Sequence, residues 1–191
     1  QRKPGALLDL RVGARAAERL AKLPAMDSRP ADDPGPTQPG LWMRSFEKGD
    51  GDIGMEGMNV ANLKPIASRA AATIDCFNKD EIKKLGDGRQ DDVAVTFTGF
   101  IEAPRDGKYK FSLRSDDGSA LFIGSLMVVN HGGSQAMSEV EGEIALKAGK
   151  HRFRVDYWNG RGDAGLVAAW SGPEVNKETI PGTAFSHAPG K

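Results

Sequence analysis

The sequence has little of several features that define common protein classes. Its one cysteine, Cys76, excludes an intramolecular disulfide framework and is expected to be a small buried residue. Its three histidines are scattered, which argues against a zinc site. Lysine plus arginine and aspartate plus glutamate each number 26, so the formal net charge is zero. Neither nucleic acid nor an anionic membrane is therefore expected as a partner.

Long apolar runs and catalytic motifs are also missing. No stretch approaches the roughly 20 apolar residues of a membrane-spanning helix, so no membrane insertion is expected. There is no phosphate-binding glycine loop and no G-x-S-x-G nucleophile motif, so an enzyme is not expected. No secretory leader is visible. Because Gln1 stands in place of an initiating methionine, we expect a processed or excised part of a longer protein.

The composition divides the chain into three parts. Residues 7–23 are rich in alanine, leucine and arginine, with apolar residues at helical spacing, and predict a helix. The following residues, 24–39, contain five prolines and are typical of a semi-extended linker. We therefore expect a helix and linker over 1–39, a folded domain over 40–187 and a short tail over 188–191.

Residues 40–187 carry short strands separated by glycine-bearing turns. Each predicted strand shows alternation of apolar and polar residues or a short apolar run. The strands are expected at 41–46, 71–77, 93–101, 108–114, 120–123, 126–130, 142–146, 152–158 and 164–170, with a partly helical segment at 80–85. The last strand is apolar on both faces and is expected to be central in its sheet. The pattern predicts an all-β fold, an antiparallel β-sandwich.

Acidic residues at one turn admit two interpretations. Asp116 and Asp117 lie between the strands 108–114 and 120–123, which we expect to pair as a hairpin. Asp117-Gly118 is a preferred dipeptide for a tight hairpin turn, which would leave Asp116 solvated. Alternatively the two carboxylates bind a cation. Calcium needs about six to eight oxygen ligands, so a cation site requires further residues.

Further oxygen ligands follow the strand 152–158. Asn159 precedes the glycine-rich loop that contains Arg161 and Asp163, and an asparagine amide oxygen is a calcium ligand type. Trp158 falls on the polar face of its strand and is either an exposed aromatic that stacks on a sugar or a partly buried edge residue. His131 is expected in a flexible loop, either at the rim of the site or simply exposed.

A second acidic segment resembles a calcium-binding loop only in part. Asp50, Asp52 and Glu56 alternate as in an EF-hand, but Met55 occupies the position that needs glycine and Ala61 the position that needs glutamate. An EF-hand is therefore excluded. The tripeptide Arg-Gly-Asp at 161–163 is too short to predict integrin binding.

Four blocks of the sequence stand out by their order and spacing. The first block begins near residues 40–41. The second is Gly-Lys-Tyr-Lys-Phe at 107–111, then Ser-Asp-Asp-Gly-Ser at 115–119 and Leu-Phe-Ile-Gly at 121–124. The third is Leu-Lys-Ala-Gly-Lys-His-Arg-Phe-Arg-Val-Asp-Tyr at 146–157, and the fourth is 165–170 followed by Ser-Gly-Pro. Together the blocks resemble the protective-antigen-type (PA-fourteen) domain family, and this specific resemblance covers about residues 40–187.

The resemblance implies a β-sandwich found in bacterial toxins, yeast adhesins, glycosidases and bacterial surface proteins. In its sugar-binding members, two adjacent aspartates joined by a cis peptide bind calcium, and these match Asp116 and Asp117. A later loop supplies an asparagine side chain, matching Asn159, and backbone carbonyls, matching Arg161 and Asp163. Vicinal hydroxyls of the sugar then complete the coordination of the ion.

These inferences lead to one main functional hypothesis and two alternatives. The main hypothesis is a calcium-dependent carbohydrate-binding module, lectin-like or adhesin-like, in a secreted or cell-surface protein that binds a glycan or polysaccharide. The first alternative is a structural or protein-interaction spacer without metal. The second is a non-catalytic accessory domain of a glycoside-degrading enzyme, because adjacent aspartates are too constrained to flank a glycosidic bond.

Overall fold

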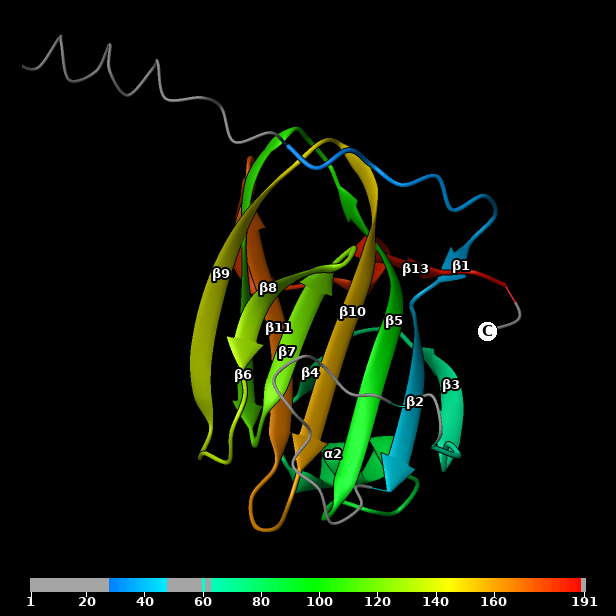
Figure 1. The fold of residues 1–191 in the computed structure, drawn as a ribbon, viewed down its shortest axis with the longest axis vertical. Coiled ribbons are helices and arrows are strands. Elements are labelled where there is room, and N and C mark those ends of the chain that lie inside the picture. Colours follow the sequence, from blue (N-terminus) through cyan, green and yellow to red (C-terminus); the bar gives the residue numbers. More distant parts are fainter. Residues whose placement is uncertain (1–27, 48–59, 61–62, 190–191) are drawn as a thin grey trace, which may run out of the picture.

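Two antiparallel sheets face each other as a β-sandwich in a computed structural model that describes residues 28–47, 60 and 63–189 (Figure 1). The predicted all-β sandwich is confirmed. The predicted helix at 7–23 and the acidic segment at 50–56 lie outside the described residues. The first sheet contains β1 (Gln38–Pro39), β2 (Leu41–Glu47), β3 (Ala67–Ala71), β5 (Val93–Ala103), β7 (Ser119–Ile123), β8 (Leu126–His131), β10 (Gly149–Asn159) and β13 (Phe185–His187). The second contains β4 (Asp75–Cys76), β6 (Gly107–Asp116), β9 (Ser138–Leu146), β11 (Gly165–Gly172) and β12 (Val175–Thr179).

The strand order places the ends of β6 and β10 at one end of the sandwich. The first sheet has the order β1-β13-β5-β10-β7-β8, with β2 against β5 and β3 beyond it. The second has the order β12-β11-β6-β9, with β4 on β11, so the apolar strand β11 is internal as expected. Helix α2 (Lys79–Leu85) lies at the same end as the carboxyl ends of β6 and β10 (Figure 1). A short 3-10 helix (Gly182–Ala184) precedes β13.

The core forms where the inward residues of the two sheets meet. Tyr109, Phe111 and Leu113 on β6 are fully buried, as the alternation predicts, whereas Lys108 and Arg114 on the opposite face are exposed. The ring of Phe111 meets that of Phe153 on β10 at a centroid distance of 6.5 Å. Aromatic side chains from both sheets thus hold the layers together.

Cys76 is buried as expected, at the end of β4. Burial raises the pKa of its thiol to about 11. The thiol is therefore protonated at neutral pH, which agrees with its expected role as a small core residue.

The predicted hairpin between residues 108–114 and 120–123 is wrong. β6 pairs with β9 and β11, whereas β7 pairs with β8 and β10 in the other sheet. The segment 116–118 therefore crosses from one sheet to the other, and Gly118 does not have a positive φ. The local pattern of two apolar strands around Asp-Gly fits a hairpin and a crossing equally well, because strand pairing is decided by distant partners.

Other differences concern short strands. The single strand expected at 71–77 is two strands in different sheets, since β3 pairs with β2 and β4 pairs with β11. The sequence did not predict β12 and β13, because both follow turns and show weak alternation. These two strands are defined by pairing with β11 and β5 rather than by composition.

Part of the predicted linker is bound to the sandwich. Arg29 forms a parallel bridge with β9. Its backbone N–H donates to the Ala145 carbonyl at 2.8 Å, and its carbonyl accepts from the Lys147 N–H at 3.0 Å.

The side chain of Arg29 also contacts the sandwich. Its guanidinium lies 2.7 Å from Nδ1 of the buried His151, whose Nε2 lies 2.7 Å from the Lys147 carbonyl. Since a carbonyl only accepts, Nε2 carries the proton and Nδ1 accepts from Arg29. The domain boundary at 39/40 stays a prediction.

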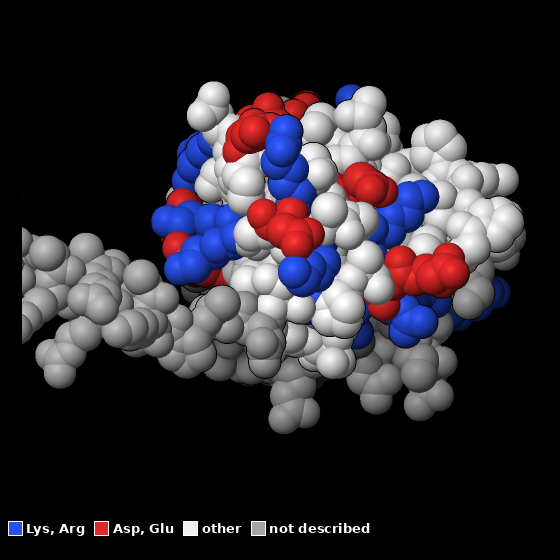
Figure 2. Space-filling view, turned by 90° about the horizontal axis from the view of Figure 1, so that it is seen from above, with Lys and Arg blue, Asp and Glu red and all other residues white. Residues whose placement is uncertain are grey.

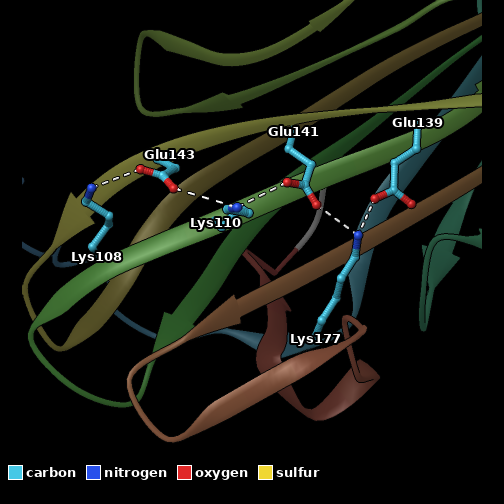
Figure 3. A network of polar contacts seen from close by, with 6 residues as sticks. All are labelled: Lys108, Lys110, Glu139, Glu141, Glu143 and Lys177. Atoms are coloured by element: carbon cyan, nitrogen blue, oxygen red, sulfur yellow. Dashed lines mark hydrogen bonds and ion pairs between the residues drawn. The ribbon is translucent and has the colours of Figure 1, made fainter.

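Charges of both signs are interspersed on the face of the molecule that Figure 2 shows. On the outer face of the second sheet they form a continuous ladder (Figure 3). Its contacts include Lys108–Glu143 at 2.9 Å, Lys110–Glu141 at 3.2 Å and Lys177–Glu141 at 2.8 Å, and Lys177 also contacts Glu139. None of the helices in the described part of the chain is long and apolar enough to cross a membrane.

Replacing Lys177 by Met is expected to lower the melting temperature slightly at low ionic strength and neutral pH. The hydrogen bonds from Lys177 and Lys110 lower the pKa of Glu141. A carboxylate with a lowered folded-state pKa stabilises the fold above its unfolded pKa, and this stability is lost as the pH falls through the folded value. The difference in melting temperature between Lys177→Met and wild type should therefore shrink in acid. It should also shrink at about 1 M salt, where the Debye length is about 3 Å.

The comparison is made by thermal melts of Lys177→Met beside Lys83→Met, an exposed α2 residue without an ion pair among the described residues. A deficit in Lys177→Met that is unchanged by salt and acid would contradict an electrostatic role for the ladder.

Candidate functional site

The two adjacent aspartates are held from three directions where β6 ends. The peptide bond between Asp116 and Asp117 is cis. The Tyr157 hydroxyl donates to the Asp116 carbonyl at 2.7 Å, and the Gln135 amide donates to the Asp117 carbonyl at 2.9 Å. The Asp117 carboxylate accepts from the Gly160 N–H at 2.8 Å. Strand β10, the β8–β9 loop and the loop after β10 therefore all fix the pair.

The surroundings of Asp116 disfavour its charged state. Burial raises the pKa of Asp116, and the negative charges of Asp117 and Asp163 raise it further. A hydrogen bond from the Met137 backbone and the positive charge of Lys79 lower the pKa of Asp116, but the net pKa remains raised. A cation placed against Asp116 and Asp117 would offset this repulsion.

Asn159 has an unsatisfied side-chain oxygen one residue before the Gly160 N–H that is bonded to Asp117. It is the last residue of β10 and is fully buried, and its Nδ2 donates to the Gln90 carbonyl at 2.8 Å. Its Oδ1 has no hydrogen-bond partner among the described residues. A buried amide oxygen without a partner is costly, so this atom calls for a ligand such as a water or a cation. The bond from Gly160 to Asp117 holds the residue after Asn159 against the acidic pair. An oxygen-rich site for a hard cation fits these residues.

Two further residues that the sequence placed in the site have largely exposed side chains. The side chains of Arg161 and Asp163 are 86% and 90% exposed. Arg161 lies 3.7 Å from Asp92, and Asp163 lies 3.3 Å from Lys79. The described residues contain no group of three or more His, Cys, Asp and Glu side chains that could hold a metal. A cation site here would therefore depend on Asn159 and on backbone carbonyls of this loop.

The structure corrects the expected surroundings of Trp158 and His131. Trp158 is 6% exposed, so the exposed aromatic that the sequence allowed is not present. Its ring lies against Gly118, and its backbone N–H donates to the Gly118 carbonyl at 2.9 Å. His131 is 8% exposed at the end of β8, where Nε2 lies 3.0 Å from the Ser138 carbonyl. It is therefore not in the exposed, flexible loop that the sequence predicts, and a place at the rim of the site stays a prediction.

A hollow that the sequence did not reveal opens beside Asp116. Its volume is about 680 Å³. It is lined by Phe77, Asn78, Lys79, Asp80, Arg114, Asp116, Ala136, Met137, Asp163 and Ala164. Asn78-x-x-Glu81 is a recognisable helix start and could have placed the preceding Phe77 outside a strand. No local signal places Met137 there, because the β8–β9 loop reaches the site only through the tertiary fold.

The fold and this site define a β-sandwich domain whose polar loops meet at one end of the two sheets. Residues 38–184 match the model of the PA14 domain, the protective-antigen-type family that the sequence resembles. The match covers well over half of the chain. The chain therefore belongs to the PA14 domain family.

The known proteins similar to the chain include two groups. Among curated proteins, the anti-sigma-I factor RsgI3 of Acetivibrio thermocellus is 29% identical over 93 residues, which are 48% of this chain and 14% of that protein. An anti-sigma factor domain-containing protein of known structure is 23% identical with a TM-score of 0.66, over 81% of this chain and 50% of that one. The chain thus spans half or less of the length of each of these two relatives.

The second group contains sugar-binding adhesins. The PA14 sugar-binding domain from an RTX adhesin is 20% identical with a TM-score of 0.64, over 78% of this chain and 99% of that one. The epithelial adhesin 9 A domain from Candida glabrata, in complex with Galβ1-3GlcNAc, is 13% identical with a TM-score of 0.65. That match covers 86% of this chain and 98% of the adhesin domain. At these identities the likeness establishes the fold.

Proposed function

We propose that this domain binds carbohydrate through a calcium ion held by Asp116, Asp117 and Asn159. The observation that carries the proposal is the buried Asn159 Oδ1, which lacks a hydrogen-bond partner among the described residues. Asn159 ends β10 and directly precedes Gly160, whose N–H is bonded to Asp117. The raised pKa of Asp116 supports it, because the repulsion around this carboxylate is relieved by a cation. Backbone carbonyls of Arg161 and Asp163 would supply further oxygen ligands.

Bound calcium would supply open coordination positions for two vicinal hydroxyls of a sugar. The chain's own residues would do the rest: Asp116 and Asp117 balance the charge, and Asn159 fixes the ion from β10. The hydrogen bonds from Tyr157 and Gln135 keep both aspartate carbonyls occupied, so the carboxylates are the groups left to bind. Adjacent carboxylates leave no room for a glycosidic bond between them, so the proposed role is lectin-like and non-catalytic.

The likeness to adhesin domains supports a setting on a cell surface or in a secreted protein. The RTX adhesin domain is a sugar-binding domain, and the epithelial adhesin domain holds a disaccharide. A non-catalytic accessory domain of a glycoside-degrading enzyme would use the same site in the same way.

The test is retention on a panel of immobilised oligosaccharides in millimolar calcium and in excess chelator. Wild-type protein is expected to bind a subset of glycans in calcium and none in chelator. Asp116→Ala and Asp117→Ala should lose all glycan binding while keeping the circular dichroism spectrum of the folded domain. Glycan binding that survives chelator would refute a role for calcium.

A second candidate, a protein-interaction module without metal, is favoured by the match to an anti-sigma-I factor. It predicts a melting temperature that is insensitive to calcium and no glycan on the panel. The two candidates are therefore separated by the same measurements.

A further inference from the structure

We infer that the hollow beside Asp116 is a second sugar subsite, in which Phe77 supports a pyranose ring, so that the domain selects oligosaccharides over single sugars. This inference rests on the proposed function, because the first ring would be the one held at Asp116 and Asp117. It goes beyond the calcium site by naming Phe77 as a further sugar-binding residue and an oligosaccharide as the ligand.

Phe77 is unusual among the phenylalanines of the described residues in being exposed. Its exposed fraction is 53%, whereas Phe97, Phe111 and Phe153 are buried in the core. An isolated exposed apolar residue needs no explanation. Phe77, however, lines the same hollow as Asp116. An aromatic face at the wall of a polar hollow is the arrangement that binds the apolar C–H face of a sugar ring.

The backbone of Phe77 is fixed on both sides. Before it, Cys76 on β4 pairs with Leu166 on the internal strand β11. After it, the Glu81 carboxylate accepts from the Phe77 N–H at 2.5 Å, while Asn78 Oδ1 accepts from the Glu81 N–H at 3.1 Å. This pair of bonds closes the start of α2 in the manner of a capping box. The aromatic ring is thus presented from a held position, which lowers the entropy cost of binding a ligand.

Polar groups for the hydroxyls of a second ring lie around the same hollow. Arg114 precedes Asp116 by two residues and so shares its face of β6, and both line the hollow. Lys79, at the first turn of α2, lies 3.3 Å from Asp163, and both of these also line it. The volume of about 680 Å³ falls within the range of about 300–1,000 Å³ typical of small-ligand sites. An aromatic ring beside cationic donors and carboxylate acceptors matches an oligosaccharide better than a purely apolar ligand.

The experiment compares calcium-dependent binding of matched mono- and disaccharides by calorimetry. The probes are methyl glycosides of galactose, glucose and mannose and the disaccharides that end in each sugar. Wild-type protein is expected to bind at least one disaccharide about tenfold or more tightly than its terminal monosaccharide. Phe77→Ala should bind that disaccharide about tenfold more weakly, near the monosaccharide level. Phe77→Trp should keep the preference.

Two controls separate this subsite from the calcium site and from the fold. Leu126→Ala removes a comparably exposed side chain, 55%, from β8 outside the hollow, and should leave all affinities unchanged. The rise in melting temperature with calcium should be the same in Phe77→Ala as in wild type. Wild-type disaccharide affinity in Phe77→Ala would overturn the subsite while leaving the calcium site standing. A wild-type chain that binds no sugar in calcium would overturn both.

Discussion

Asp116→Asn is expected to abolish the rise in melting temperature that calcium gives the wild-type domain, and to leave the calcium-free domain at least as stable as wild type. Burial, with the charges of Asp117 and Asp163, raises the folded-state pKa of Asp116 above its ordinary value. The folded state therefore holds the Asp116 proton more tightly than the unfolded state does. Above the unfolded pKa, the charged group costs stability, and the cost is relieved as the pH falls. Asparagine removes this cost together with the negative charge that would balance a calcium ion at this position.

The expected size of the calcium effect follows from linkage. A ligand that binds only the folded state at about 100 times its Kd adds about 2.7 kcal/mol to the free energy of unfolding. For a domain of about 150–250 residues, each kcal/mol shifts the melting temperature by about 2–4 °C. Calcium should therefore raise the melting temperature of the wild-type domain by about 5–11 °C at that concentration.

The measurement is a calcium titration of the melting temperature for wild type, Asp116→Asn and Asp163→Asn. Asp163 is a matched control, because its side chain is 90% exposed and the substitution keeps its backbone carbonyl. Asp163→Asn should retain most of the calcium shift. An equal calcium shift in wild type and Asp116→Asn would show that the ion binds elsewhere.

Gly118→Ala is expected to destabilise the domain by about 1–3 kcal/mol or more and to disrupt the candidate calcium site. A Cβ at Gly118 would lie 2.0 Å from Trp158 Cζ2 and 2.2 Å from Cε2, inside any allowed contact. The Gly118 carbonyl accepts from the Trp158 backbone N–H at 2.9 Å, which ties the two backbones together. Relief of the clash must therefore move the indole ring or Asp117, the residue next to Gly118.

Chemical denaturation of Gly118→Ala and Gly162→Ala tests this explanation. Gly162 has a φ of +109°, and a Cβ added there would have no atom within 4 Å, so its substitution carries a backbone cost without a clash. Gly118→Ala should lose more stability than Gly162→Ala and should also lose the calcium shift. A Gly118→Ala domain with wild-type stability would mean that Trp158 does not hold this segment as its contacts indicate.

Much of the fold could be predicted because it depends on local alternation. Tyr109, Phe111 and Leu113 alternate with polar residues, and such a strand buries one face whichever partner it finds. The resemblance to PA14 domains singles out Asp116, Asp117 and Asn159 from the sequence alone. That these residues bind calcium stays a prediction, but the hydrogen bond from Gly160 to Asp117 does bring their two loops together.

The sequence by itself determined that the chain is a neutral, disulfide-free β-sandwich, because composition and the period of apolar residues are local properties. Only the tertiary structure decided which sheet each strand joins, as β6 and β7 demonstrate. It also decided that Gly118 makes room for Trp158, that Asn159 Oδ1 is left without a partner among the described residues, and that Phe77 lines a hollow. The physical reason is that these features arise from contacts between residues far apart in the chain, which no local pattern encodes.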